Sequence, residues 1–411
     1  MTYNNYRRSG TFQKYSQRSN SPHGRGASNF SRFPQKRRRA GERIHFSKFI
    51  NKSVVEDTPV IFTPVHAFSD FKIDAELKEA VIRKGYVTPT PIQDKAIPEV
   101  LLGRDVLGIA NTGTGKTGAF LIPLINKVRH DRKEQVLIIV PTRELAIQIE
   151  NELTGFTKGM KIFSVCVVGG MPIGRQISQL RYQYNFIIGT PGRLKDLVDR
   201  KMIHLSEFRT VVLDEADRML DMGFINEMRA VMDKMPKERQ TLFFSATLSP
   251  TIEKLIGEFL KNPVRISVKN GDTAKNVDQD VVRLTKDSNK VDVLHTLLIQ
   301  EEFNKVLVFG RTKHGVEKLS EMLVKRGIKA ESIHGNKNHG QRQRALGKFK
   351  DNHAQVLVAT DVAARGLDIP NVSHVINFDL PETYDDYVHR IGRTGRGDKK
   401  GKALTFIDSH A

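Results

Sequence analysis

Cysteine is almost absent from this 411-residue chain, which has Cys166 and no other. An internal disulfide is therefore excluded, and no group of cysteine and histidine has zinc-site spacing, which favours a reducing, cytoplasmic location. No stretch approaches the roughly 18 consecutive apolar residues of a membrane span, and the basic N-terminus lacks the apolar core of a signal peptide. We expect a soluble, unexported protein with no membrane partner.

Acidic residues are missing from the first 40 positions, which hold ten Lys or Arg. This tenth of the chain supplies half of the net charge of +20. It is rich in Arg, Ser, Gly and Asn with interspersed aromatics, a composition that cannot bury enough apolar surface to fold alone. Arginines neutralise phosphates and rings stack on unpaired bases, so the segment is either a nucleic-acid contact or an idle solvated tail.

The rest of the chain has the composition of a globular protein, with 39% apolar residues overall. The pattern predicts a disordered basic tail (1–40), a connector (41–66), a first domain (67–269), a polar linker (270–280) and a second domain (281–411). Pro59 and Pro64 and weak periodicity mark the connector.

One stretch organises the first domain. The apolar run Val106–Ile109 predicts a buried strand, followed by a loop with Gly113 and Gly115 and a helix from Gly118. Strand, glycine loop and helix form the context of a phosphate-binding loop, in which backbone N–H groups surround a phosphate. Lys116 would reach the β- and γ-phosphates of ATP, and the Thr117 hydroxyl would bind Mg²⁺. Ala110 stands where the first glycine is usual, so a plain glycine-rich turn is the alternative.

Strand and helix patterns alternate after this loop. Strands are expected at Val136–Val140, Ile162–Val168, Phe186–Gly189, Val211–Leu213, Leu242–Phe244 and Val264–Val268. The alternation predicts a parallel sheet covered on both faces, with ligands beyond the carboxyl ends of the strands. Asp214 follows a buried strand and can hold Mg²⁺, while Glu215 can orient and deprotonate the water that attacks the γ-phosphate. The alternative is an acidic turn that caps the next helix.

A second alternation of strands and helices begins near Val281. Strands are expected at Val281–Leu284, Val306–Phe309, Lys329–Ile333, Val356–Ala359, Val375–Asn377 and Ala403–Phe406, and helices at Lys290–Gln300, Gly315–Arg326 and Arg342–Lys350. This unit lacks a phosphate loop, but residues 389–396 carry Arg390, Arg393 and Arg396. Guanidinium groups suit the charge that develops on a transferring phosphate, so the segment is either an arginine finger or a basic surface loop.

The ordered motifs resemble those of the DEAD-box RNA helicases over residues 68–409. The matching segments are Gln93, Ala110–Thr117, Pro141–Ala146, Gly169-Gly170, Thr190–Arg193, Asp214–Asp217, Ser245–Thr247, Thr360–Asp368 and His389–Arg396. The resemblance implies an α/β fold of two tandem RecA-like doubly wound parallel-sheet domains. It also implies an ATP-dependent helicase that needs Mg²⁺ and binds RNA by its backbone, as a monomer.

The resemblance also implies a role for each matching residue. ATP would be bound by Phe68, Gln93, Thr112, Gly113, Thr114, Gly115, Lys116, Thr117 and Asp368; catalysis would use Lys116, Glu215, Arg393 and Arg396; and Thr117 and Asp214 would hold the metal. RNA would contact Arg143, Gly170, Thr190, Arg193, Arg342 and Thr360. Ser245 and Thr247 would couple hydrolysis to strand separation, with Asp217 also in a coupling role, and His389 and Arg390 would couple the two domains. His339 stands where the family usually has Gln.

The implied activity is a clamp that closes on ATP and RNA, separates short duplexes and releases RNA after hydrolysis. Three alternatives share many of these motifs: an ATP-gated RNA scaffold with little unwinding, a DNA translocase of the same superfamily, and a simple phosphate-loop NTPase. The family usually adds a helix after the final strand, so Ala411 is expected to be either a natural C-terminus or a truncation.

Overall fold

The computed structural model describes residues 46–51, 62–111, 113–268, 277–285, 287–364, 367, 369–395 and 400–408. The tail expected at 1–40 lies outside them. Within these residues the chain forms two parallel sheets, one of seven and one of six strands. No helix in the described part is long and apolar enough to cross a bilayer.

The first sheet has the strand order β3-β4-β2-β5-β6-β1-β7. Its strands are β1 (Val106–Ile109), β2 (Val136–Ile139), β3 (Ser164–Val167), β4 (Phe186–Gly189), β5 (Thr210–Leu213), β6 (Gln240–Ser245) and β7 (Val264–Ser267). The helices are α1 (Ala75–Arg83), α2 (Pro91–Leu101), α3 (Lys116–His130), α4 (Arg143–Thr157), α5 (Ile173–Gln179), α6 (Pro191–Asp199), α7 (Ala216–Asp221), α8 (Ile225–Met232) and α9 (Pro250–Phe259), with a 3₁₀ turn at Leu205–Glu207.

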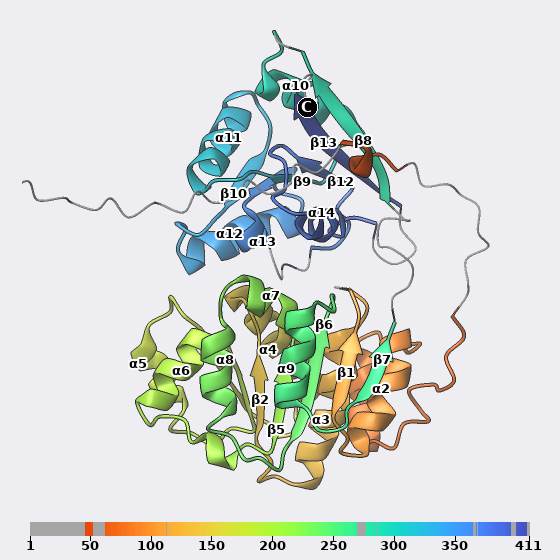
Figure 1. Cartoon of the computed structure of the whole chain (residues 1–411), viewed down its shortest axis with the longest axis vertical. Coiled ribbons are helices and arrows are strands. Elements are labelled where there is room, and N and C mark those ends of the chain that lie inside the picture. Colours follow the sequence, from red (N-terminus) through yellow and green to blue (C-terminus); the bar gives the residue numbers. More distant parts are fainter. Residues whose placement is uncertain are drawn as a thin grey trace, which may run out of the picture. The chain divides into compact units, whose positions relative to one another are not determined.

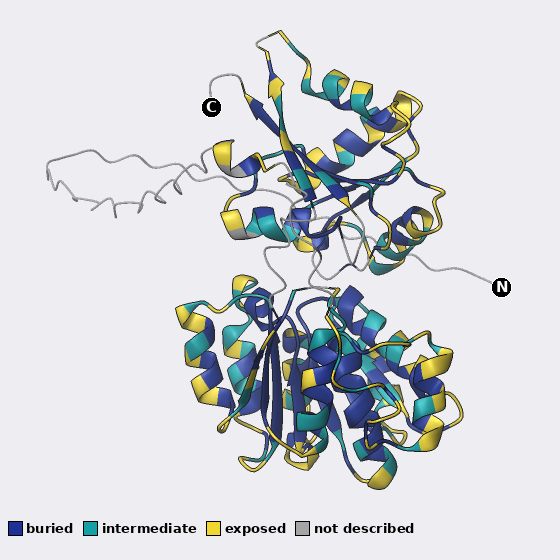
Figure 2. Cartoon of the chain, turned by 90° about the vertical axis from the view of Figure 1, so that its right-hand side faces the viewer, coloured by how far each residue is buried: buried dark blue, intermediate teal, exposed yellow. Residues whose placement is uncertain are grey.

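Helices cover both faces of this sheet (Figure 1). Along β2, Val136 and Ile138 enter one core and Leu137 and Ile139 enter the other. Alternate side chains of a strand point to opposite faces, so fully apolar strands identify a sheet buried on both sides. Every residue of the five inner strands, β1, β2, β4, β5 and β6, is buried (Figure 2), whereas the edge strands β3 and β7 are partly exposed.

Gly108 is the exception in the apolar run of β1. It is in register with Phe244 of β6, and a Cβ at residue 108 would lie only 2.5 Å from the Phe244 ring. Glycine is required because the aromatic ring occupies the space of a side chain. This close packing lies directly below the glycine loop that follows β1.

The second sheet has the strand order β10-β11-β9-β12-β13-β8. Its strands are β8 (Val277–Leu284), β9 (Val306–Phe309), β10 (Ala330–Ile333), β11 (Val356–Ala359), β12 (His374–Asn377) and β13 (Gly401–Asp408). The helices are α10 (Lys290–Leu298), α11 (Lys313–Lys325), α12 (His339–Lys350), α13 (Asp361–Ala364) and α14 (Tyr384–Ile391), and a 3₁₀ turn, η1, spans Phe46–Phe49. Val306 and Val308 face one core, and Leu307 and Phe309 the other.

The predicted fold class is confirmed. Many element boundaries differ from expectation by one or more residues, and the structure explains three of these differences. β8 begins at Val277, not Val281, because it pairs with β13 from Gly401 onward. α3 begins at Lys116, directly after the left-handed Gly115. α12 begins at His339, not Arg342, because Asn338 and Gln341 form a capping box that starts the helix earlier.

Candidate functional site

The loop after β1 depends on two left-handed glycines, Gly113 (φ 84°) and Gly115 (φ 91°). At Gly115 a side chain is also excluded by space, since a Cβ would lie 2.6 Å from the Gln93 amide nitrogen. The Thr114 hydroxyl donates to the Asn111 carbonyl at 2.8 Å and fixes the turn. Thr112 lies outside the described residues. The loop therefore delivers the N-terminus of α3 to the carboxyl edge of the sheet.

Lys116 is the first residue of α3, and its side chain is 6% exposed. Its ammonium has no hydrogen-bond partner among the described residues and lies 3.9 Å from Asp214 Oδ1. A buried ammonium is stable only when anionic or carbonyl oxygens surround it. The unsatisfied donors at a helix N-terminus fit the phosphates of a nucleotide.

Asp214 and Glu215 follow β5. Asp214 Oδ1 accepts from the Glu215 amide at 2.9 Å, and Glu215 has a left-handed backbone (φ 54°, ψ 49°). Glu215 Oε2 accepts from the buried Arg218 guanidinium at 3.0 Å. Burial raises the pKa of Asp214 to about 6, an effect that the Lys116 ammonium partly offsets. These carboxylates can supply oxygen ligands to a hard cation.

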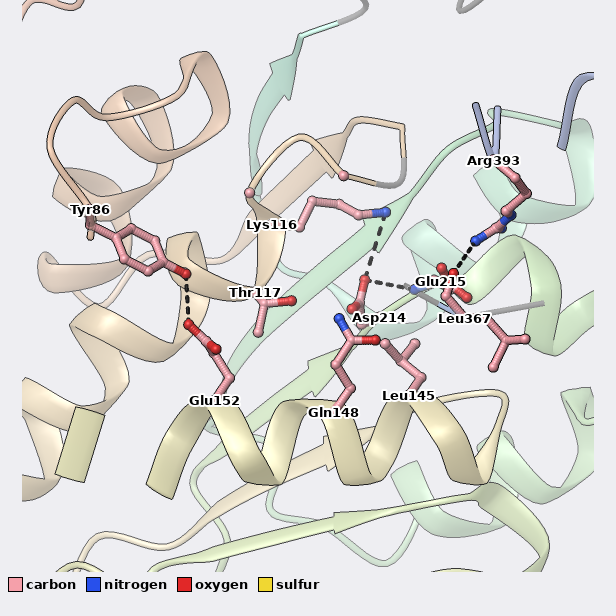
Figure 3. A pocket seen from close by; sticks show the side chains of 13 residues that line it. Tyr86, Lys116, Thr117, Leu145, Gln148, Glu152, Asp214, Glu215, Leu367 and Arg393 are labelled. Carbon is pink, nitrogen blue, oxygen red and sulfur yellow. Dashed lines mark hydrogen bonds and ion pairs between the residues drawn. The ribbon is translucent and has the colours of Figure 1, made fainter. Parts of the chain in front are cut away.

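These groups share one pocket of about 300 Å³ (Figure 3). Of the residues expected at the ATP site from the sequence, Gly113, Gly115, Lys116, Thr117, Asp214, Glu215 and Arg393 line it. The lining also includes residues that sequence reasoning missed, namely Tyr86, Gly118, Leu145, Gln148, Glu152 and Leu367.

Three of the missed residues lie on one face of α4. Leu145, Gln148 and Glu152 are spaced three and four residues apart, and Figure 3 shows them pointing from this helix toward the pocket. Glu152 accepts from the Tyr86 hydroxyl at 2.8 Å and pairs with Lys84 at 2.7 Å. Gln148 and Glu152 lie four residues apart on the helix that begins at Arg143, and this spacing is a sequence signal that places both on one face.

Phe68 and Gln93, expected at the adenine, are buried beside the loop and are absent from the pocket lining. The Phe68 ring packs edge-on against Phe71 and Tyr86 at centroid distances of 5.8 Å. The Gln93 amide donates to the Gly115 carbonyl at 3.0 Å and accepts from Thr90 N at 3.0 Å. Gln93 therefore supports the shape of the glycine loop in this structure, and its adenine role stays a prediction.

Asp217 connects the acidic turn to the end of β6. Its Oδ2 accepts from Ala246 N at 3.0 Å, from Thr247 N at 2.9 Å and from the Thr247 hydroxyl at 3.2 Å. The Ser245 hydroxyl donates to the Thr247 carbonyl at 2.8 Å. Although burial opposes its ionisation, the charges of Lys116 and Arg218 hold the pKa of Asp217 below its ordinary value. Three hydrogen bonds therefore join Asp217 of the acidic turn to residues 246 and 247.

Helix α14, which belongs to the domain of the second sheet, carries His389 and Arg390. The Arg390 guanidinium binds both Asp361 carboxylate oxygens, at 2.6 and 2.7 Å, and donates to the Asp379 carbonyl at 2.6 Å. Arg393 follows the helix and donates to the Leu367 carbonyl at 2.8 Å. Burial, reinforced by the nearby Arg218, lowers the pKa of His389 to about 4, so its imidazole is neutral at pH 7. Asp368 and Arg396 lie outside the described residues.

The candidates for RNA contact in the first sheet gather at the ends of β3 and β4. The Thr190 hydroxyl accepts from Gly169 N at 3.4 Å, and Arg193 donates to Gln176 Oε1 at 3.0 Å. Gly170 is left-handed (φ 72°), and a Cβ there would overlap the Arg143 guanidinium. Backbone amides, a hydroxyl and two guanidiniums, which are groups that commonly contact nucleic-acid phosphates, are thus assembled at one edge of the sheet.

The two candidates for RNA contact in the domain of the second sheet, Arg342 and Thr360, lie on different elements. Arg342 is on the first turn of α12, and its Nη2 pairs with Glu144 Oε2 at 2.9 Å. Thr360 follows β11, where its amide donates to the Ile333 carbonyl at 3.3 Å. Burial lowers the pKa of Arg342.

Two family models match the chain. Residues 90–255 match the DEAD/DEAH box helicase model, and residues 289–398 match the helicase conserved C-terminal domain model. Among curated proteins, the chain is similar to the DEAD-box ATP-dependent RNA helicase CshA of Bacillus subtilis (strain 168). The two are 46% identical over 342 residues, which cover 83% of this chain and 69% of the relative.

Solved structures give the same result. The fold is similar to that of Mss116p bound to single-stranded RNA and AMP-PNP, with a TM-score of 0.76, 30% identity and coverage of 84% of this chain and 75% of the other. It is also similar to S. cerevisiae Dbp5 bound to RNA and ADP BeF3, with a TM-score of 0.73, 30% identity and coverage of 84% and 90%.

Proposed function

The chain belongs to the DEAD-box ATP-dependent RNA helicases and is an RNA-dependent ATPase, and we propose that ATP closes its two lobes over RNA, separates short duplexes locally and releases RNA after hydrolysis. The observation that carries this proposal is that Lys116, Asp214, Glu215 and Arg393 line one pocket. The first three belong to the domain that contains the phosphate loop, and Arg393, which follows α14, belongs to the domain of the second sheet. A ligand that touches both lobes favours the closed form by its difference in affinity for the two states.

Nucleotide binding rests on the loop and on Lys116. Backbone amides at the start of α3 would donate to the phosphates, as would the Lys116 ammonium, which has no hydrogen-bond partner among the described residues. The Asp214 carboxylate and the Thr117 hydroxyl would hold Mg²⁺, which neutralises charge on the phosphates when bound. Both residues line the pocket and present the oxygen atoms that this ion prefers.

Hydrolysis needs a base and a counter-charge. Glu215 would orient the attacking water and take its proton, and the Arg218 ion pair fixes the position of that carboxylate. Arg393, with Arg396, would stabilise charge that develops on the transferring phosphate. In this structure Arg393 donates to Leu367, so this bond would rearrange as the guanidinium turns to the phosphate.

RNA would be held by its backbone. Arg143, Gly170, Thr190 and Arg193 would contact one part of the strand, and Arg342 and Thr360 another. Contacts to phosphate and sugar fix the position of a strand without reading its sequence. The bond from Asp217 to Ala246 and Thr247 would carry the change at Glu215 to Ser245–Thr247.

The decisive experiment compares ATP turnover alone, with RNA and with DNA, and then follows displacement of a short RNA duplex. We expect turnover that RNA stimulates and DNA does not, together with ATP-dependent displacement. RNA-stimulated turnover without displacement would instead support an RNA clamp or scaffold. Equal turnover with and without nucleic acid would contradict both.

A further inference from the structure

Residues 46–51, here called the strap, precede the first sheet in sequence but pack against the second. The Phe49 side chain is 1% exposed and joins Val277, Tyr387, Ile391 and Ala403 in a separate small core. Its ring meets the Tyr387 ring edge-on, with a centroid distance of 4.8 Å and an interplanar angle of 62°. Such a pair is directional as well as apolar, so it fixes orientation in addition to excluding water.

The strap also completes the edge of the second sheet. β8 is the outermost strand in the order described, and Asn51 forms an antiparallel bridge with Gln279 of that strand. Asn51 N donates to the Gln279 carbonyl at 3.1 Å, and Gln279 N donates to the Asn51 carbonyl at 2.9 Å. The bridge covers backbone groups that an edge strand otherwise leaves open.

Both contacts lead to α14. The Tyr387 hydroxyl donates to the Gln279 side chain at 2.9 Å. The strap therefore contacts Tyr387 in two ways: Phe49 packs on its ring, and Asn51 pairs with Gln279, the residue that accepts its hydrogen bond. Tyr387 and Ile391 lie one turn apart and form the apolar face of this eight-residue helix. His389 and Arg390 lie on the same helix, and Arg393 N donates to the Arg390 carbonyl at 3.1 Å.

We propose that Phe49 is a positioning residue for catalysis: the strap anchors α14 and thereby sets the position of the Arg393 guanidinium. This inference rests on the proposed role of that arginine in hydrolysis. α14 is too short to be stable alone, and its orientation depends on packing at its apolar face. Small displacements of a catalytic group lower turnover more than they lower binding of the substrate.

The test uses the full chain with Phe49→Ala, and Ile50→Ala as matched control. Ile50 lies in the same strap but is 39% exposed. We expect Phe49→Ala to lower kcat of RNA-stimulated ATP turnover by about tenfold with KM for ATP within about twofold, because Lys116 and its loop are untouched. Phe49→Leu should keep most of the activity, and Ile50→Ala all of it. Circular dichroism at the assay temperature establishes that each variant is folded.

Hydrogen exchange of residues 384–391 gives a second readout that does not depend on catalysis. Phe49→Ala should speed exchange in α14, while α3 keeps its protection. If exchange in α14 is unchanged in Phe49→Ala, the strap does not anchor this helix. If exchange is faster but kcat is unchanged, the strap anchors the helix without positioning Arg393 for catalysis. If the unaltered protein shows no RNA-stimulated turnover, the proposed function fails, and exchange in α14 still decides whether the strap holds the helix.

Discussion

The ammonium nitrogen of Lys116 lies 3.9 Å from Asp214 Oδ1, and both side chains are buried. Burial raises the pKa of Asp214 from 3.8 to about 6, against the attraction of Lys116. The native state therefore holds this proton more tightly than the unfolded state, and the stability this gives at low pH is lost as pH rises through about 6. Ionisation at neutral pH leaves a buried carboxylate whose charge a divalent cation can neutralise.

The first prediction is that affinity for Mg-ATP weakens below about pH 6. Cation binding needs the carboxylate, so each pH unit below that value should raise the dissociation constant by up to about tenfold. Titration with a fluorescent nucleotide between pH 5 and 8 measures this. Asp214→Asn should bind weakly with no inflection near 6. A flat profile in the unaltered protein would rule out Asp214 as the titrating group.

The second prediction concerns Glu215. Glu215→Gln keeps an acceptor for Arg218 but removes the base, so turnover should fall about 10²–10⁴-fold while ATP and RNA binding persist. Single-turnover ATPase and RNA-binding assays measure the two effects. Glu253→Gln, which changes an exposed ion pair with Arg265, is the matched control and should have normal turnover. Full activity in Glu215→Gln would refute the assignment.

The third prediction concerns Asp217. Asp217→Ala removes the acceptor for two amides and a hydroxyl of residues 246 and 247. We expect strand displacement to be lost more completely than ATP turnover, because the acidic turn no longer moves the segment after β6. Asp221→Ala, on the exposed side of α7, is the control and should retain both activities. Equal losses of displacement and turnover in Asp217→Ala would argue against a coupling role.

The fourth prediction concerns the approach of Arg143 to Gly170. Gly170→Ala strains a left-handed backbone and displaces the guanidinium, so RNA affinity should fall about tenfold with ATP affinity unchanged. Gly174→Ala is the control, since a Cβ there meets no heavy atom within 4 Å. Filter binding at several salt concentrations measures the affinity. Normal RNA binding by Gly170→Ala would show that Gly170 and Arg143 do not contribute to RNA binding.

The fifth prediction concerns the first 40 residues and their ten cations. If all ten contact RNA phosphates, their deletion should reduce the slope of log affinity against log salt by up to about 7. A neutral Gly/Ser segment of equal length is the control for chain length and should behave like the deletion. Unchanged affinity and slope would show that the tail does not bind RNA.

The sequence predicted most of the fold because the strands are short apolar runs between polar turns. Val356–Ala359 was placed without error, and the same runs predicted sheets buried on both faces. Phe49 was not predicted, because its partner Tyr387 is far away in the chain and the connector has only weak periodicity. Sequence motifs predicted Lys116, Asp214, Glu215 and Arg393, whereas Tyr86 and Glu152 lie outside those motifs and meet through the hydrogen bond from the Tyr86 hydroxyl to Glu152.

Gly108 and Phe244 form a matched pair across β1 and β6, one without a side chain and one with a large ring. Enlarging the glycine alone would push the strand away and carry the phosphate loop with it, whereas a smaller partner at 244 would make room. Anyone redesigning or recombining this scaffold must therefore exchange the two positions together, since each constrains what the other can become.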